Sequence, residues 1–416
     1  MIGVVCLLVL LVTAHRHPRP RTEALVALAT AAVVLGSGYV GRGDAVDAVR
    51  HLLPVVGFLV AILVVAEVCA RAGLFEAAAL LVGARSRRDP RRLFLGVFVL
   101  AALVTTMLSL DATVVLLTPV VLGAARGFGA SGRPGAYACL RLANSGSLLL
   151  PVANLTNLLA MPYLHLTFVG FALRMALPLV VVLVVEYVGL RMIFRRDLPA
   201  SRRPEIGSAR IPVPTGSAAG GPRWLVPAVV VGVMLVAFAA LSPFGVEPWV
   251  PAAIAAVVLL LWARRCRVVT VPAALHAGHP SFALWVLALG VTVAGLSRDF
   301  LGDLVDRVLP DGTGFGALLL IAVIATLAAA LLANLSATLV IVPALVPLGD
   351  TAILAALMGL TIGAGLTWTG SLANLLWRRT LARAGTTPST ARFHLVSLTL
   401  TPVALVAAIA ALAVTS

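Results

Sequence analysis

The residues of this chain best suited to chemistry lie in two short polar stretches inside otherwise apolar sequence. The first, Leu148–Leu159, reads LLLPVANLTNLL, and a related stretch in the second half of the chain, Gly365–Leu376, reads GLTWTGSLANLL. Asn, Thr and Ser side chains can coordinate an alkali cation or hydrogen-bond a polyhydroxylated solute without carrying a charge. Doubled polar segments that Pro or Gly interrupts are typical of a transporter's binding site. The alternative is that these side chains only join neighbouring membrane helices.

Asp111 is the most informative single residue. It lies in the segment Leu110–Val115 (LDATVV), which recurs in the second half as Leu335–Val340 (LSATLV) with Ser336 in place of the acid. A carboxyl group deep in apolar sequence is costly to bury in a membrane, so such a residue is by default a candidate for function. Because it can gain and lose a proton, it suits a proton carrier. The alternative is an N-cap of the following helix that faces water.

These segments together predict one binding site. We expect Asp111 to carry a proton beside a substrate- or ion-binding cluster that consists of Ser147, Asn154, Thr156, Asn157, Asn334, Ser336, Thr367, Thr369, Ser371 and Asn374. Helix breaks are expected at Pro151, which lacks a backbone N–H, and at residues that allow close backbone approach, namely Gly363, Gly365 and Gly370. Arg141 precedes Asn154 on the same predicted span and is a candidate contact for an anion.

The composition is that of a polytopic membrane protein. The 416 residues are 61% hydrophobic and 11% charged, and apolar runs long enough to cross a bilayer recur along the chain. The weak alternation over about ten residues that marks a membrane β-barrel is absent from the sequence. The sequence therefore predicts an all-α fold with about 10–12 transmembrane segments in a lipid bilayer.

The charges and the cysteines exclude several other classes of protein. The net charge is +15, and all 31 basic residues are Arg. These residues cluster between apolar runs, which favours positive cytoplasmic loops over nucleic-acid binding. The four Cys form no CxxC pair, and the chain has no Walker-type glycine loop. We therefore predict no metal site, no cofactor and no enzymatic activity.

The loop charges divide the chain into two repeats. Residues 1–194 and 224–416 form the two predicted halves, and the hydrophilic segment 195–223, rich in Pro, Gly, Ser and Arg, is expected to be a cytoplasmic linker. If the basic loops are cytoplasmic, the short apolar segments 112–125 and 337–349 run in opposite directions. We therefore expect inverted-topology repeats, each with a re-entrant hairpin and a broken helix. Two amphipathic segments, 75–84 and 299–309, are expected at the membrane interface.

Four segments resemble signatures of the arsenical pump membrane protein (ArsB) family, within the larger group of ArsB/NhaD-type and dicarboxylate/citrate-type ion transporters. The resemblance spans nearly the whole chain. Leu110 and Ala333 stand where the family usually has Asn, and Thr361 and Ala364 stand where it often has a carboxylate and a Pro. The resembling segments are Leu110–Leu122 (LDATVVLLTPVVL), Ser147–Leu159 (SLLLPVANLTNLL), Ala333–Leu345 (ANLSATLVIVPAL) and Thr369–Arg379 (TGSLANLLWRR).

The resemblance implies a secondary active transporter of the plasma (inner) membrane that exports arsenite or antimonite in exchange for protons. A neutral trihydroxy arsenic species would suit a cage of Asn, Ser and Thr with few charges. The same fold leaves open a Na⁺/H⁺ antiporter and a Na⁺-coupled carboxylate (citrate-like) transporter, and a passive channel or facilitator is the alternative of another class. The resemblance also allows a cytosolic ATPase subunit that docks on the basic loops, and a homodimer stays open.

Overall fold

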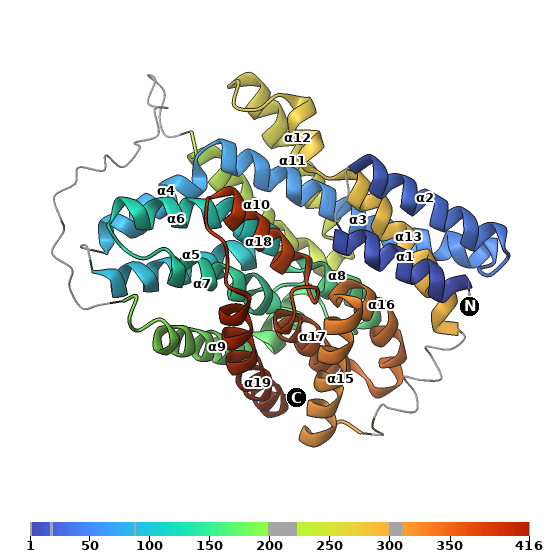
Figure 1. The fold of residues 1–416 in the computed structure, drawn as a ribbon. Coiled ribbons are helices and arrows are strands. Elements are labelled where there is room, and N and C mark those ends of the chain that lie inside the picture. The colour runs from blue at the N-terminus through green and yellow to red at the C-terminus, as the bar shows by residue number, and fades with distance from the viewer. Residues whose placement is uncertain are drawn as a thin grey trace.

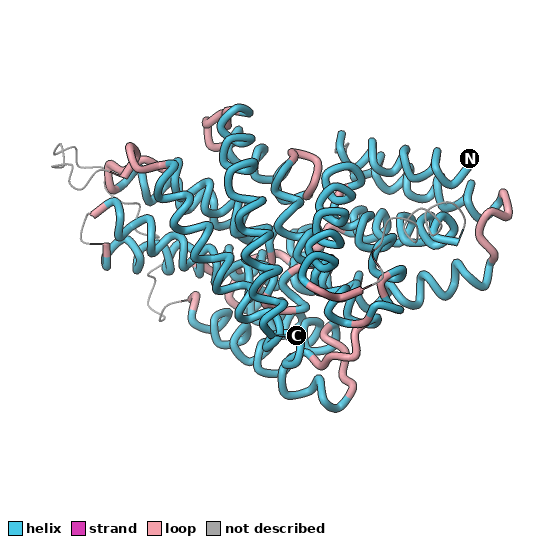
Figure 2. Tube along the Cα trace, turned by 90° about the horizontal axis from the view of Figure 1, so that it is seen from below, coloured by secondary structure: helices cyan, strands magenta, loops and turns pink. Residues whose placement is uncertain are grey.

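The computed structural model describes residues 2–16, 20–86, 89–198, 223–298, 310 and 312–415, and these residues form helices and loops with no strand. The helices of the first half are α1 (Ile2–Arg16), α2 (Pro20–Gly36), α3 (Arg42–Arg71), α4 (Leu74–Arg85), α5 (Pro90–Met107), α6 (Thr118–Gly127), α7 (Arg133–Ser145), α8 (Leu155–Ala160) and α9 (Phe168–Ile193). The helices of the second half are α10 (Leu225–Leu241), α11 (Trp249–Arg265), α12 (Val271–Ala277), α13 (Pro280–Arg298), α15 (Phe315–Leu332), α16 (Asn334–Ala344), α17 (Asp350–Ile362), α18 (Leu372–Arg383) and α19 (Thr390–Thr415). Figure 2 shows the described trace to be helical nearly throughout.

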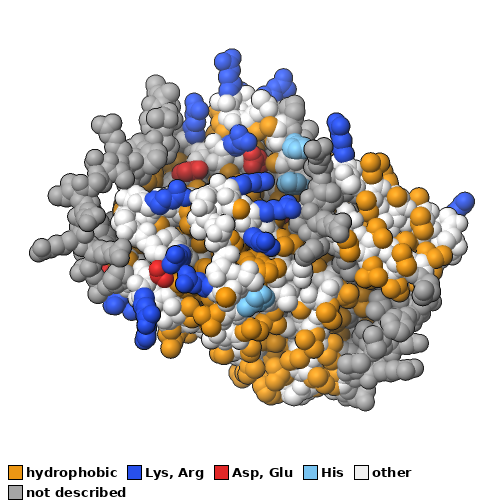
Figure 3. All heavy atoms as spheres, in the orientation of Figure 1, with side chains coloured by type: hydrophobic (Ala, Val, Ile, Leu, Met, Phe, Trp, Pro, Cys, Tyr) orange, Lys and Arg blue, Asp and Glu red, His pale blue; other side chains and the backbone are white. Residues whose placement is uncertain are grey.

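The predicted all-α polytopic membrane fold is confirmed. Within the described ranges, six helices are long and apolar enough to cross a membrane, and shorter apolar helices lie between them. Large hydrophobic side chains such as Leu173, Val236 and Leu331 are exposed on the helix surfaces, as expected of side chains that face lipid. On the face seen in Figure 3, hydrophobic side chains gather over the lower part, where α15 and α19 lie. The total of 10–12 segments depends on the shorter helices and stays a prediction.

The core of each half is a hairpin packed on an interrupted helix. In the first half, α5 packs on α7, and the π-helical segment η1 (Ala112–Leu117) continues into α6 to complete the hairpin. In the second half, α15 packs on α17, and α16 forms the returning arm. The halves then meet crosswise, because α16 contacts α8 and η1 contacts α18. The long helices α9 and α19 pack against each other below this centre in Figure 1.

A second group of helices flanks this centre. Helices α1, α2, α3 and α13 pack together at the right of Figure 1, and α11 lies along α3. Of the two predicted interfacial segments, 75–84 coincides with the separate helix α4. The other, 299–309, lies outside the described residues.

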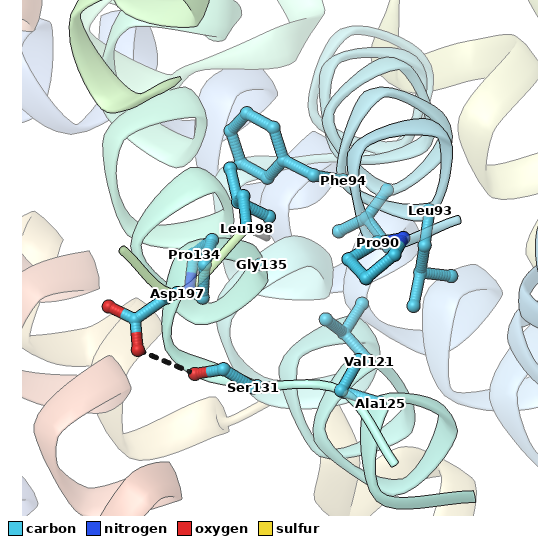
Figure 4. A pocket seen from close by; sticks show the side chains of 13 residues that line it. Pro90, Leu93, Phe94, Val121, Ala125, Ser131, Pro134, Gly135, Asp197 and Leu198 are labelled. Carbon is cyan, nitrogen blue, oxygen red and sulfur yellow. Dashed lines mark hydrogen bonds between the residues drawn. The ribbon is translucent and has the colours of Figure 1, made fainter. Parts of the chain in front are cut away.

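The first half ends in a tether that joins its last helix to the hairpin. Ser131 Oγ donates to Asp197 Oδ1 at 3.2 Å, and Arg91 Nε donates to the carbonyl of Leu198 at 3.4 Å. Leu198 is buried there and lines a small pocket with Phe94 and Val121 (Figure 4). Most of the predicted linker follows this tether, and its residues 199–222 lie outside the described ranges. The division into domains at 194 and 224 therefore stays a prediction.

The contact of α15 with α17 generates a test of the packing. A Cβ on Gly359 of α17 would collide with the carbonyl oxygen of Ala322 on α15, which is backbone and cannot rotate away. We expect Gly359→Ala to destabilise the protein by about 1–3 kcal/mol through overpacking. Thermal unfolding in detergent should show a lower Tm. The control is Gly316→Ala on α15, where a Cβ meets nothing within 4 Å. An unchanged Tm in Gly359→Ala would contradict this packing.

Candidate substrate site

The first interruption begins where α7 ends. After Ser145 the chain passes through the 3-10 turns Gly146–Leu148 and Pro151–Ala153 before α8 begins. Asn154 is extended, with φ −144° and ψ 139°, and its Oδ1 accepts a hydrogen bond from the N–H of Thr156 at 3.2 Å. This is an N-cap, which satisfies an N–H that has no partner inside the helix. The sequence breaks the helix here because Pro151 cannot donate to the helical ladder.

The second interruption repeats this geometry in the other half of the chain. Ser371 has φ −145° and ψ 143°, and its Oγ accepts from the N–H of Ala373 at 3.1 Å to cap α18. The 3-10 turn Gly363–Leu366 precedes it. Ser371 is therefore the structural counterpart of Asn154. The duplication seen in the sequence is a duplication of backbone conformation, while the inverted orientation of the halves stays a prediction.

One Asn in each half closes the loop of the break. Asn157 Nδ2 donates to the carbonyls of Ser147 at 2.9 Å and Leu150 at 3.2 Å. Asn374 Nδ2 donates to the carbonyls ten and seven residues before it, those of Ala364 and Thr367, each at 2.8 Å. The offsets are identical in the two halves. These side chains occupy backbone acceptors that the interrupted helix leaves free.

A direct hydrogen bond joins the two breaks. Asn144 on α7 donates through Nδ2 to Asn374 Oδ1 at 2.9 Å. Both side chains are buried, with exposed fractions of 3% and 0%. A buried polar contact of this kind is costly to break, because each group would lose its partner without gaining water. The broken helix of the first half is thus fixed to that of the second.

The hairpin tips also correspond, but with different backbones. Thr113 Oγ1 lies 3.4 Å from the carbonyl of Ser109, and in the second hairpin Thr338 Oγ1 donates to the carbonyl of Asn334 at 2.7 Å. The first returning arm starts as a π-helix. The second tip bends at Ala333, whose φ of +64° is strained for a residue with a Cβ.

A cavity of about 70 Å³ lies where the hairpin tips and the breaks meet. It has room for a few water molecules or a solute of similar size. Ser109 and Asp111 line it from the first hairpin, and Asn334 lines it from the second. The remaining lining residues are Val152, Ala153, Asn154, Leu155 and Thr156 of the first break, Ser371 and Leu372 of the second, Leu110 and Leu335 of the hairpins, and Phe58, Leu59, Ile62 and Phe282 of α3 and α13.

Asp111 is the one ionisable side chain among these described lining residues. Its Oδ1 is buried and has no hydrogen-bond partner. The alternative role as an N-cap is wrong, because the side chain makes no capping bond and Ser109 Oγ instead accepts from the N–H of Ala112 at 3.2 Å. Thr156 Oγ1, Asn157 Oδ1 and Ser336 Oγ are likewise buried without partners. Of these residues, Asp111 and Thr156 line the cavity. Unpaired polar atoms at a cavity indicate that something else binds there.

The structure separates the other predicted site residues from the cavity. Ser147, Asn157 and Asn374 hold the breaks from behind, and Ser336 is buried on the second hairpin without lining the cavity. Thr367 and Thr369 face an open basin of about 660 Å³ instead. That basin is also lined by Trp368, Arg378, Arg379 and His394, among others. The roles assigned to these residues stay predictions.

Two further predicted groups lie apart from the cavity. The glycines allow neighbouring parts of the chain to pack closely against their backbone. A Cβ on Gly363 would collide with the side chain of Thr326, and a Cβ on Gly370 would lie 2.5 Å from the carbonyl oxygen of Ala364. Arg141, the candidate anion contact, is bonded to Glu186 and Thr401 and does not line the cavity. Its role toward an anion also stays a prediction.

Sequence reasoning missed the lining residues Ser109, Phe58, Ile62 and Phe282. A signal existed for Ser109, because it lies two residues before Asp111, as Asn334 lies two residues before Ser336 in the repeat. No such signal exists for Phe58, Ile62 and Phe282. They lie in apolar helices where lipid-facing and cavity-facing positions look alike in sequence.

The sequence is similar to a family of known membrane proteins over nearly its whole length. The sequence model of the arsenical pump membrane protein family (ArsB) matches residues 2–415. The chain belongs to this family. An arsenical pump membrane protein of Yersinia enterocolitica is 28% identical over 426 residues, covering 97% of this chain and 96% of that protein. One of Escherichia coli is 28% identical over 403 residues, covering 92% and 91%.

A solved structure shares the fold. The YdaH transporter of Alcanivorax borkumensis, described as having an unusual topology, superposes with a TM-score of 0.61 at 16% identity. The match covers 89% of this chain and 86% of that one. The family membership and this fold make the chain a multi-pass membrane transporter, as the sequence predicted.

The paired Asn residues generate a test of the breaks. Asp has nearly the shape of Asn but no N–H donors, so Asn157→Asp and Asn374→Asp each remove two hydrogen bonds to backbone carbonyls. We expect each variant to lose about 1–3 kcal/mol of stability and most of its transport. Unfolding in detergent and uptake into vesicles measure the two effects.

The matched control is Thr361→Val, two residues before the second break begins at Gly363. Its Oγ1 is buried without a partner, so removing it should leave stability unchanged or slightly raised. If the Asn variants behaved like this control, the breaks would not depend on these bonds.

Proposed function

We propose that this protein is a secondary active transporter that exports arsenite or antimonite across the plasma membrane in exchange for protons. The observation that carries the proposal is the lining of the central cavity. It offers one ionisable group, Asp111, among neutral amide and hydroxyl side chains. The curated relatives of similar length are arsenical pump membrane proteins, which supports an arsenical substrate.

The chemistry of the lining suits a neutral hydroxylated solute. Trihydroxy arsenic or antimony carries hydroxyl groups that both donate and accept hydrogen bonds. Thr156 and Asn334 offer matching groups, and Asp111 offers acceptor oxygens. None of the described lining residues is basic, so a carboxylate substrate would find no cation among them. This disfavours citrate-like uptake.

Asp111 is the proposed proton carrier. A charged carboxylate in the cavity attracts the polar solute, and protonation removes both the charge and one acceptor site. Solute and proton then compete for the same group, which is what an exchange mechanism needs. Because Asp111 Oδ1 has no fixed partner, no internal hydrogen bond has to break when the proton arrives.

Na⁺/H⁺ exchange is the second candidate function. Oxygen atoms of Asp111 and Thr156, which both line the cavity, are buried without partners. Such oxygens are also the ligands of an alkali cation. A competition between Na⁺ and protons at Asp111 would use the same cavity.

We also propose the orientation and the partners. In this proposal, the Arg residues near the ends of helices such as α11 and α18 favour the cytoplasmic side for these ends and for the segment 195–223. With this orientation, a cytosolic ATPase subunit could dock on the basic loops.

A homodimer is a further proposed assembly. A native molecular mass in detergent equal to twice that of the chain would support it.

Transport into everted membrane vesicles tests the proposal. Wild-type vesicles with an acidic interior should accumulate arsenite or antimonite. Asp111→Asn should abolish this accumulation against a gradient while passive equilibration persists, because the amide cannot carry the proton. The matched control is Glu67→Gln, a carboxyl group outside the cavity that pairs with Arg71 at 2.8 Å, and it should keep at least about half of the uptake.

The alternatives give different results in the same vesicles. Accumulation by Asp111→Asn against the gradient would refute the proton-carrier role. Exchange of Na⁺ for protons with no metalloid uptake would favour the second candidate. Passive equilibration alone in the wild type would make the protein a channel or facilitator.

A further inference from the structure

The second break lacks the residue that stiffens the first. Pro151 in the first break fixes its own φ and needs no partner for an N–H. When the two polar stretches are aligned, the residue that corresponds to Pro151 is Trp368, and Gly365 and Gly370 correspond to Leu148 and Ala153. Gly loses more conformational entropy on folding than any other residue. The second break therefore depends more on support from the surrounding fold.

A buried ion pair lies beside this break. Arg141 on α7 and Glu186 on α9 have side chains only 2% and 0% exposed. Arg141 Nη2 donates to Glu186 Oε1 at 2.6 Å, and Nε lies 3.1 Å from both carboxylate oxygens. Arg141 Nη1 donates to Thr401 Oγ1 on α19 at 3.0 Å. One guanidinium group thus joins three helices of the two halves.

The same guanidinium touches the backbone of the second break. A Cβ on Gly365 would lie 2.6 Å from Arg141 Nη1, so the guanidinium group packs directly against this glycine. Asn144, three residues after Arg141 on the same face of α7, donates to Asn374. Asn374 in turn holds the carbonyls of Ala364 and Thr367. Helix α7 of the first half therefore supports the second break at two consecutive turns.

The second half has no charged residue at the position that corresponds to Arg141. In the same alignment of the halves, the residue that corresponds to Arg141 is Met358, which is fully buried and carries no charge. A buried ion pair is weak evidence for stability, because packed apolar residues of similar size often stabilise a fold as well or better. Apolar residues cannot donate a hydrogen bond to Thr401, as Arg141 does while it also contacts Gly365. The arrangement therefore points to positioning.

We propose that Arg141 is a positioning residue that couples the second break to the first half. Held by Glu186, its guanidinium keeps the segment 363–371 in place, so Ser371 and Leu372 stay in register with Asp111 and Asn154 across the cavity. The transport consequence rests on the proposed function. The coupling itself does not depend on the substrate.

Hydrogen–deuterium exchange of the purified protein in detergent tests the coupling. Thr401→Val removes one bond to the guanidinium and keeps the volume. The double variant Arg141→Met with Glu186→Met removes both charges, so that neither is left buried alone. In both variants we expect several-fold faster exchange in segment 363–371 and unchanged exchange in segment 146–154. Thr415→Val, at the far end of α19, is the matched control and should match the wild type.

Transport kinetics give the second readout. We expect Thr401→Val to raise KM for arsenite about threefold to tenfold with unchanged protein in the membrane, as the loss of one hydrogen bond would. The double variant should unfold at a Tm near that of the wild type but transport poorly. A purely structural pair would instead allow the double variant to recover both transport and wild-type exchange.

Each result bears on one proposal. Wild-type exchange in segment 363–371 of both variants would overturn the positioning role, as would full transport by the double variant. An absence of arsenite transport in the wild type would refute the proposed function and leave the exchange comparison to decide the coupling.

Discussion

An interrupted helix inside a membrane must find partners for the backbone groups that the interruption frees. Hydrocarbon offers none, and each unsatisfied carbonyl or N–H is costly. This protein meets the constraint twice in the same way, with Asn157 and Asn374 donating to carbonyls ten and seven residues before them. Asn154 and Ser371 cap the helices that follow. These side chains supply hydrogen-bond partners that the interrupted helices lack.

The cavity follows from the same constraint. Two satisfied breaks and two hairpin tips bring polar side chains together where continuous helices would bring only apolar ones. The atoms left over after the backbone is satisfied include Asp111 Oδ1 and Thr156 Oγ1. The polar residues of the two stretches therefore fall into two groups. Asn157 and Asn374 bond the backbone of the breaks, whereas residues such as Thr156 face the cavity with an unpaired atom. Sequence position alone does not separate these two roles.

The two halves are equal in backbone and unequal in chemistry. The first half supplies the acid Asp111 and Pro151, whereas the second half has Ser336 and Trp368 at the corresponding positions. The contacts between them also differ in kind, since Arg141 and Asn144 of the first half place polar groups against the second break, whereas the residue equivalent to Arg141 is the apolar Met358. As a result, Asp111 is the one ionisable group among the described residues that line the central cavity, while both halves share the same backbone pattern.

The sequence by itself determined the membrane class, the doubled segments and the position of the acid. Hydropathy and broken apolar runs depend on local residue order, and two related stretches in the same order reveal a repeat wherever they lie in space. It also placed both breaks, because Pro151 and the run of glycines act on their own backbone.

Only the tertiary structure decided which polar residues face the cavity and which hold the chain. Asn154 and Asn157 are three residues apart, yet one lines the cavity and the other bonds carbonyls behind it. Phe58, Phe282 and Arg141 acquired their places through helices distant in sequence, and the pairing of Arg141 with Glu186 spans 45 residues. The sequence shows which residues share one face of a helix, but it does not show which neighbouring helix will pack on that face. Those contacts form only when the helices meet.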